Sequence, residues 1–284
     1  QVQNGVSTKA GITYALTGRN LLQLNVGYFN TPQSLRNIYP NVRNSNRILP
    51  NLKNEMAYTA DASYILRSSF LKGRLTGFFT EIENTAETNF FYTETALTDE
   101  IDKDFVAQTI DGIKKRHFGL ELGAEAQLHP TVKLTAAAAI GQYTYINNPS
   151  LYISAGDVNK AIDEVKMKNY HVPSGPQQAY SLGLEYRNPK YWWVGATANF
   201  LAQNYVSLSA LNRTSQFFID PATKAPYSNI DLDKARQLLK QERLDDVFLV
   251  NLVAGKSWRV KKTYINLMAS VNNLFDIQFL SGGF

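Results

Sequence analysis

Residues 118–145 alternate apolar and polar side chains with a period of two, which is typical of β-strands and not of helices. Every even-numbered residue from 118 to 128 is apolar, and so is every even-numbered residue from 132 to 140. The three residues between these runs, 129–131, read His-Pro-Thr and predict a tight turn. We therefore expect a long β-hairpin whose apolar face meets either a protein core or lipid.

The same alternation recurs along the chain, and each recurrence consists of two runs joined by a short polar turn. Sixteen Tyr and fifteen Phe agree with an all-β fold, because aromatic residues favour strands. We expect about ten strands, joined alternately by short turns and long loops. The expected hairpins cover about residues 6–28, 55–83, 118–145, 180–200 and 246–276. The expected long loops cover about residues 31–53, 84–111, 146–176 and 209–244.

The length of these strands favours a membrane protein. They run for about eleven to fifteen residues, beyond the ~5 to 6 of an average soluble strand and enough for the ~9 to 11 of a tilted transmembrane strand. Aromatic residues gather near strand ends, as expected at the two bilayer interfaces: Tyr186, Tyr191, Trp192, Trp258 and Tyr264. The pattern predicts a transmembrane antiparallel up-and-down β-barrel, in preference to a soluble β-sandwich or lipocalin.

Composition argues against several function classes. The chain has no Cys, which removes thiolate metal sites, disulfides and thiol catalysis. The net charge of +5 is spread along the chain, so nucleic-acid binding is not expected. His117, His129 and His171 lack the close spacing of a metal-binding pair, and we expect no metal, no other cofactor and no enzymatic activity.

The polar face of the strands is expected to form a wet inner wall. Glu121 and Glu125 share this face and could form an acid/base pair, but a hydrated lumen wall is the preferred interpretation. The residues expected to face the lumen are Asp61, Glu121, Glu125, Gln127, Glu185 and Arg187.

Two loop segments show helical spacing. Val158, Ile162 and Val165 predict a short helix in the third long loop, and residues 231–243 predict an amphipathic helix in the fourth. The fourth loop combines aromatic and apolar side chains that could contact a ligand or partner, or simply pack on the loop itself. The contact candidates are Phe217, Phe218, Tyr227, Leu232, Leu238 and Leu239.

The end of the last strand carries a specific motif. Val271, Asn272, Asn273, Leu274, Phe275 and Asp276 resemble the VNNLFD signature near the C-terminus of TonB-dependent outer-membrane receptors. Residues 241–246, 255–258 and 188–192 also resemble barrels that occur among SusC-like receptors. In that family the motif strand is the penultimate one of twenty-two. The resemblance therefore implies that residues 1–284 are the C-terminal portion of the barrel and hold strands twelve to twenty-one.

The count of strands leads to a similar expectation for the chain ends. Both ends should finish at the long-loop rim, so at least one further strand is expected before Gln1 and one after Phe284. The resemblance implies that a plug domain, through which TonB would act, also precedes Gln1.

The resemblance implies a receptor that imports a scarce nutrient across the outer membrane of a Gram-negative bacterium. The implied partners are outer-membrane lipid, TonB and, in the SusC branch, a SusD-like surface lipoprotein. Two other roles stay open from the sequence: a passive porin, and a receptor-like barrel that serves as a structural subunit of a larger outer-membrane assembly.

Overall fold

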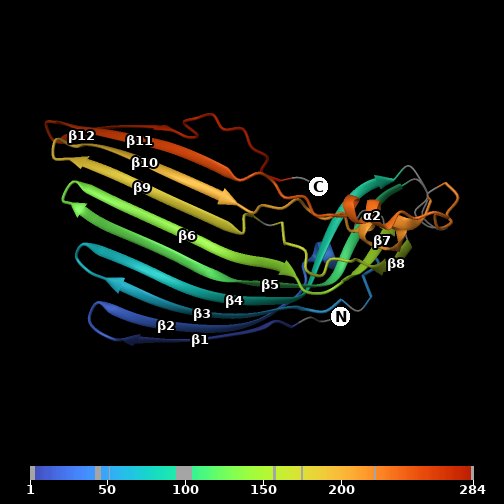
Figure 1. Cartoon of the computed structure of the whole chain (residues 1–284). Helices are drawn as coiled ribbons and strands as arrows, with labels where there is room; N and C mark the ends of the chain where they lie inside the picture. The colour runs from blue at the N-terminus through green and yellow to red at the C-terminus, as the bar shows by residue number, and fades with distance from the viewer. Residues whose placement is uncertain are drawn as a thin grey trace.

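The computed structural model describes residues 4–41, 46–50, 52–93, 104–155, 158–173, 175–220 and 222–282. These residues form one antiparallel sheet of twelve strands, ten of which lie in a continuous row (Figure 1). The row consists of β1 (Val6–Ala15), β2 (Asn20–Thr31), β3 (Glu55–Arg67), β4 (Leu71–Thr93), β5 (Asp104–His129), β6 (Val132–Tyr145), β9 (Gln178–Asn188), β10 (Trp192–Ala202), β11 (Val247–Val260) and β12 (Thr263–Val271).

Neighbours in this row follow one another along the chain, except where β7 (Ser150–Ala155) and β8 (Val158–Glu164) are inserted between β6 and β9. Short turns join the strands at one end of the curved sheet, and longer connections join them at the other (Figure 1). The all-β, up-and-down architecture predicted from the sequence is confirmed. Among the described residues, no helix combines the length and hydropathy that a membrane span requires.

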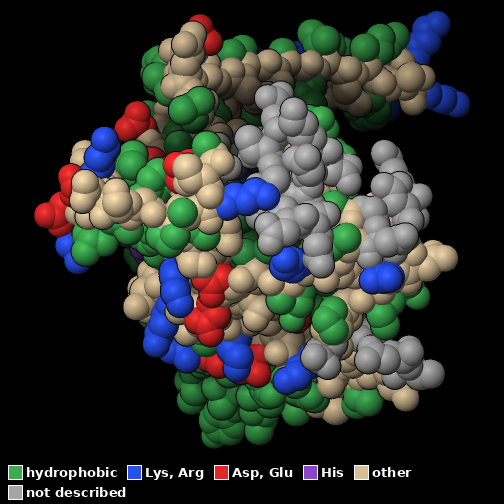
Figure 2. Space-filling model, turned by 90° about the vertical axis from the view of Figure 1, so that its right-hand side faces the viewer, with side chains coloured by type: hydrophobic (Ala, Val, Ile, Leu, Met, Phe, Trp, Pro, Cys, Tyr) green, Lys and Arg blue, Asp and Glu red, His purple; other side chains and the backbone are tan. Residues whose placement is uncertain are grey.

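The outer face of the sheet exposes large apolar side chains. Leu120, Leu122, Leu182 and Leu184 lie on this face and are between 44% and 56% exposed. Seen from the long-loop end, hydrophobic side chains gather along the lower edge of the molecule and charged side chains gather over the loops (Figure 2). An apolar surface of this extent is suited to lipid rather than to water.

A pair of charges limits the apolar surface on the long-loop side. Arg116 Nη2 lies 2.8 Å from Glu81 Oε2, and the guanidinium lies 6.0 Å from the ring centroid of Phe79. Below this pair, β5 presents only apolar side chains outward from Phe118 to Leu128. Ten residues of strand tilted by ~40° cover about 25 Å along the membrane normal, which matches the apolar band of a membrane barrel.

Aromatic side chains border the apolar band at its two edges. On the long-loop side the Tyr28 and Tyr58 rings lie 5.3 Å apart, and on the short-turn side the Tyr186 and Trp192 rings lie 5.2 Å apart. Tyr264 does not share the outer face, because it pairs with Arg259, which alternates with the outward Trp258.

Three expectations from the sequence were wrong. Residues 84–111 were expected to be a loop, but β4 and β5 continue through most of that range as a paired extension. Register shifts between Ile82 and Glu87 interrupt the period-two pattern there. The segment around Val158 forms β8 and not a helix, because pairing with β7 satisfies its backbone groups. The last strand ends at Val271, five residues before the expected end.

Beyond the apolar band, the chain builds an outer lobe from residues 84–93, 104–114, 146–155 and 158–173. Its strands β7 and β8 continue the sheet from the extension of β5 (Figure 1). Ile113, Leu151 and Val165 are fully buried there. The strands of the row are held together by backbone pairing and expose their apolar outer face, whereas the outer lobe has a protein core of its own.

Helices occur on the long-loop side of the sheet. The described helices are α1 (Leu35–Ile38), the 3-10 turns η1 (Leu211–Arg213) and η2 (Ser215–Phe218), and α2 (Leu232–Leu238). Asp231 caps α2, because its Oδ1 accepts from the backbone N–H groups of Asp233 at 3.1 Å and Lys234 at 3.0 Å. A helix within residues 231–243 is thereby confirmed.

Two glycines on β5 provide a matched test of packing on the inner face. A methyl group at Gly119 would overlap the carbonyl oxygen of Ile140, whereas one at Gly123 would meet nothing within 4 Å. Gly119→Ala should therefore destabilise the fold by about 1–3 kcal/mol through overpacking. Gly123→Ala should be neutral or slightly stabilising, since glycine is unfavourable within a strand. Urea unfolding of the two full-length variants measures the difference, and equal midpoints would contradict the packing seen here.

Candidate functional site

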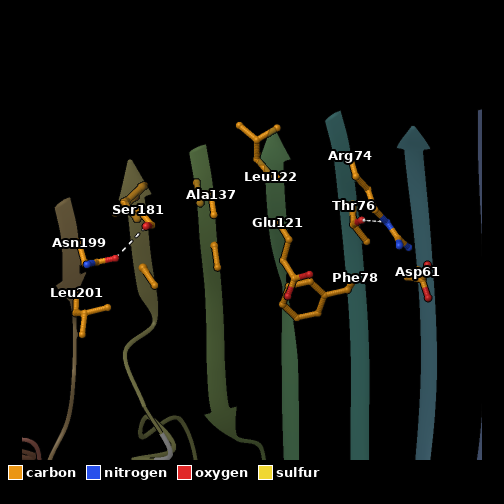
Figure 3. Close-up of a pocket in the computed structure, with 15 residues that line it drawn as sticks. Asp61, Arg74, Thr76, Phe78, Glu121, Leu122, Ala137, Ser181, Asn199 and Leu201 are labelled. Atoms are coloured by element: carbon orange, nitrogen blue, oxygen red, sulfur yellow. Dashed lines mark hydrogen bonds between the residues drawn. The ribbon is translucent and has the colours of Figure 1, made fainter. Parts of the chain in front are cut away.

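The inner face of the sheet carries a concavity of about 680 Å³. Side chains from neighbouring strands point into it, as Figure 3 shows for β3, β4, β5, β9 and β10. Its polar lining comprises Asp61, Arg74, Thr76, Glu121, Ser181 and Asn199. Alternation along each strand places these residues opposite the apolar outer face.

Arg74 is the centre of a hydrogen-bonded group on β3 and β4. Its guanidinium donates to Ser63 Oγ at 3.0 Å and to Thr76 Oγ1 at 3.2 Å, and the two hydroxyls lie 2.9 Å apart. Ser63 and Thr76 are 3% and 8% exposed, so they hold the guanidinium in a fixed position. No carboxylate among the described residues forms an ion pair with Arg74, which leaves it available to an anionic group.

A ladder of alternating charges crosses the inner face nearer the short turns. Glu125 lies 3.6 Å from Lys72 and 3.9 Å from Lys133, and Lys133 lies 3.8 Å from Glu185. Glu185 Oε1 also accepts from Arg187 Nε at 2.6 Å. These are cross-strand and same-strand pairs at a hydrated surface, where each contributes little to stability. Their main effect is to make this part of the wall strongly polar.

Glu121 and Glu125 lie on the same face of β5 but have different neighbours. Gly123 separates them along β5, and Glu125 is engaged by two lysines. Glu121 lies beside the ring of Phe78 (Figure 3). Within the part of the chain that the structure describes, no three His, Asp or Glu side chains converge on a point where a metal ion could bind.

The structure places all six residues expected on the inner wall on the same face of the sheet, although not in one cluster. Asp61 accepts from Asn25 Nδ2 at 2.8 Å near the middle of β3. Gln127 lies near the short turn, where its amide donates to the carbonyl oxygen of His129 at 2.8 Å. Arg187 lies over the Trp193 ring, 5.5 Å from its centroid.

Sequence patterning missed Arg74, Ser63 and Thr76. The signal was obscured because Phe78 points into the concavity and breaks the apolar-out alternation of β4. The cross-strand register shows which residues of neighbouring strands lie side by side, and it pairs Ser63 with Thr76 and Thr76 with Glu121.

The contact candidates of the fourth long loop do not form one patch. Phe218, Leu232 and Leu239 line a common groove beside α2. Tyr227 and Leu238 are exposed and lie outside that lining. Phe217 stacks edge-on against Phe218, with ring centroids 5.2 Å apart.

The motif at residues 271–276 begins at the last residue of β12 and forms a turn. Asn273 adopts a φ of 52°, and its N–H donates to Asn251 Oδ1 on β11 at 2.8 Å. The Asn273 side chain accepts from the N–H of Ile277 and donates to its carbonyl oxygen, both at 3.0 Å. The bond to Asn251 ties the end of β12 to β11, and the two bonds with Ile277 close the turn, so the observed contacts of Asn273 are structural.

The pKa values of His171 and Asp163 in the outer lobe are shifted from their ordinary values. Burial lowers the pKa of His171, whose ring stacks on Tyr205 with centroids 4.0 Å apart. Hydrogen bonds from Ser215, one of them a 3.0 Å bond from its N–H, hold the pKa of Asp163 below its ordinary value. Burial therefore favours the neutral form of His171, and the hydrogen bonds favour the charged form of Asp163.

Comparison with known proteins gives a consistent result. A family model described as TonB dependent receptor-like, beta-barrel matches residues 1–274. No curated protein sequence matches the chain.

Several solved structures share the fold. The copper transporter OprC has a TM-score of 0.63 and 16% identity over 98% of this chain and 35% of that one. The ferric citrate transporter FecA in its unliganded form has a TM-score of 0.59 and 17% identity over 96% of this chain and 34% of that one. The siderophore receptor PiuA from Acinetobacter baumannii has a TM-score of 0.59 and 17% identity over 96% and 32%, respectively. The chain spans about a third of the length of these proteins.

Proposed function

Because the chain belongs to the TonB-dependent receptor family, we propose that it forms part of a receptor that imports a scarce nutrient across the outer membrane. The observation that carries the proposal is the family match over residues 1–274. The sheet supports it with an outer face suited to lipid and a polar inner face. Barrels of this family lie in the outer membrane of Gram-negative bacteria, and that is the location of this chain.

Within the whole receptor, residues 1–284 would be the C-terminal portion of a 22-stranded barrel. Ten strands in one row and the motif beginning at the end of the tenth support strands twelve to twenty-one. A plug domain would precede Gln1 and would carry the contact with TonB.

The inner face would serve as part of the lumen wall around the plug. Its hydrogen-bonded Arg74 group and its ladder of charges offer polar contacts that keep the passage hydrated. In this role Asp61, Glu121, Glu125, Gln127, Glu185 and Arg187 face the lumen. Their chemistry is that of a wall and not of a catalyst.

The relatives suggest the nutrients to test first. OprC is a copper transporter, FecA a ferric citrate transporter and PiuA a siderophore receptor. A complexed metal is therefore the leading class of cargo for this chain. A SusD-like surface lipoprotein is a further candidate partner on the long-loop side.

Uptake in the native host tests the proposal against its two alternatives. Cells with and without the full-length receptor are given copper, ferric citrate or a ferric siderophore, each in a strain with TonB and in one without it. We expect saturable uptake of one of these that requires both the receptor and TonB. Uptake that persists without TonB would indicate a passive porin. Absence of uptake for every compound, with co-purification of other outer-membrane subunits, would indicate a structural role.

A further inference from the structure

A groove in the outer loops lies apart from the inner face of the barrel. It consists of two adjoining hollows of about 490 and 330 Å³, which share Tyr170, Phe218 and Leu239. The Tyr170 hydroxyl donates to the carbonyl oxygen of Leu239 at 3.3 Å and so connects the outer lobe to the end of α2. Together the hollows have the size of a small-molecule site.

The smaller hollow is cationic. Lys166, Lys168 and Arg213 line it, together with the polar Asn148 and Asn212. Lys166 is neutralised by Glu164, whose Oε2 lies 3.1 Å from its Nζ. Among the described residues, no carboxylate forms an ion pair with Lys168 or Arg213, so two positive charges face this hollow without compensation.

Arg213 is the decisive residue. It is only 8% exposed, and its guanidinium carbon lies 4.3 Å from the ring centroid of Tyr170. The ring contacts one face of the guanidinium, and the described residues supply no acceptor for the N–H donors at its edge. A guanidinium binds a carboxylate or phosphate through two parallel hydrogen bonds, and the stacked Tyr170 ring leaves the edge of this one open to the hollow.

The larger hollow is apolar in character. Leu232, Ala235 and Leu239 line it with the ring of Phe218. Arg236, Gln237 and Lys240 complete its lining, and Arg236 is already paired with Asp233 at 2.8 Å. The groove thus joins a cationic end to an apolar end through the rings of Tyr170 and Phe218.

We infer that this groove binds a small organic anion, with a carboxylate or phosphate on Arg213 and Lys168 and an aromatic or apolar body against Phe218 and α2. The groove is part of the outer loops, beyond the apolar band, which favours a free solute over a lipid headgroup. Where the bound anion is the imported nutrient, the inference rests on the proposed function. Equilibrium binding tests the site and uptake tests the function, so the two can fail separately.

The test uses the purified full-length receptor in detergent and isothermal titration calorimetry. The probes are phenyl phosphate, inorganic phosphate, and vesicles that contain phosphatidic acid. Arg213→Gln removes the buried cation, and Lys168→Gln removes an exposed one without disturbing the packing. Arg243→Gln is the matched control, because it removes a positive charge that pairs with Asp246 at 2.6 Å and does not line the groove.

We expect phenyl phosphate to bind more tightly than inorganic phosphate. Arg213→Gln should weaken binding by at least about tenfold and Lys168→Gln by a few-fold, with Arg243→Gln unchanged. The Lys168 variant keeps the test decisive if Arg213→Gln fails to fold. Absence of phenyl phosphate binding, or equal affinity in the parent and Lys168→Gln, would overturn the inference. Binding of the vesicles alone would overturn the assignment to a free solute.

Discussion

Leu122→Arg is expected to destabilise the folded receptor in a bilayer by about 2–4 kcal/mol, whereas Glu121→Arg should leave stability within about 0.5 kcal/mol of the parent. The two residues are adjacent on β5 and lie at the same depth, on opposite faces of the sheet. Leu122 is 44% exposed on the apolar outer face, between Leu75 and Ala138 on the neighbouring strands. An arginine there must be desolvated in hydrocarbon, whereas one at position 121 enters a polar concavity.

Urea-induced unfolding of the full-length variants, refolded into lipid vesicles, measures this difference. Both variants place the same side chain, an arginine, at the same depth of β5, so the comparison reports mainly which face meets lipid. Equal unfolding midpoints for Leu122→Arg and Glu121→Arg would show that the face assignment is wrong. A larger loss for Glu121→Arg would show that it is reversed.

The barrel strands were predictable because lipid imposes a strict rule on their sequence. Every outward residue of β5 from Phe118 to Leu128 must be apolar and the inward ones are free to be polar, so a period of two is visible without any structure. The aromatic residues at strand ends follow from the same bilayer geometry. Such constraints act locally, one strand at a time.

The outer lobe was not predictable in this way. The extension of β5 buries Val106 and Ala107, which are neighbours in sequence, as well as Ile110 and Ile113. Strand segments covered on both faces lose the alternation that identifies a strand, and the register shifts in β4 remove it further. Strand β8 is paired with β7. Apolar residues spaced three to four positions apart indicate a helix and could not reveal this pairing.

The same difference applies to the candidate sites. Glu121 and Glu125 were found from alternation alone, because a strand fixes which side a residue faces. Arg213 was missed, since it is a single arginine in a loop and its stacking partner Tyr170 is forty-three residues earlier in the chain. Only the packing of the outer lobe against η1 brings the two together.

Replacing residues 214–240 by a short Gly/Ser linker is expected to abolish uptake of the nutrient or retention of a surface partner, while membrane insertion stays intact. The strands on either side are unaffected, because β10 ends at Ala202 and β11 begins at Val247. The two ends of the loop also remain joined by backbone hydrogen bonds outside the replaced residues. The N–H of Leu244 donates to the carbonyl oxygen of Asn204 at 2.8 Å, and the N–H of Val206 donates to the backbone carbonyl oxygen of Glu242 at 3.0 Å.

The replacement removes Phe218, α2 and Leu239, and with them the apolar half of the groove. A smaller replacement of residues 222–229 is the matched control, since it removes the exposed Tyr227 but keeps every residue that lines the groove. Heat-modifiable migration on gels reports insertion, and uptake or co-purification reports function. If both variants insert and import like the parent, the loop is only a cover. If the smaller replacement is already enough to abolish uptake, the contact surface is the tip around Tyr227 and not the groove beside α2.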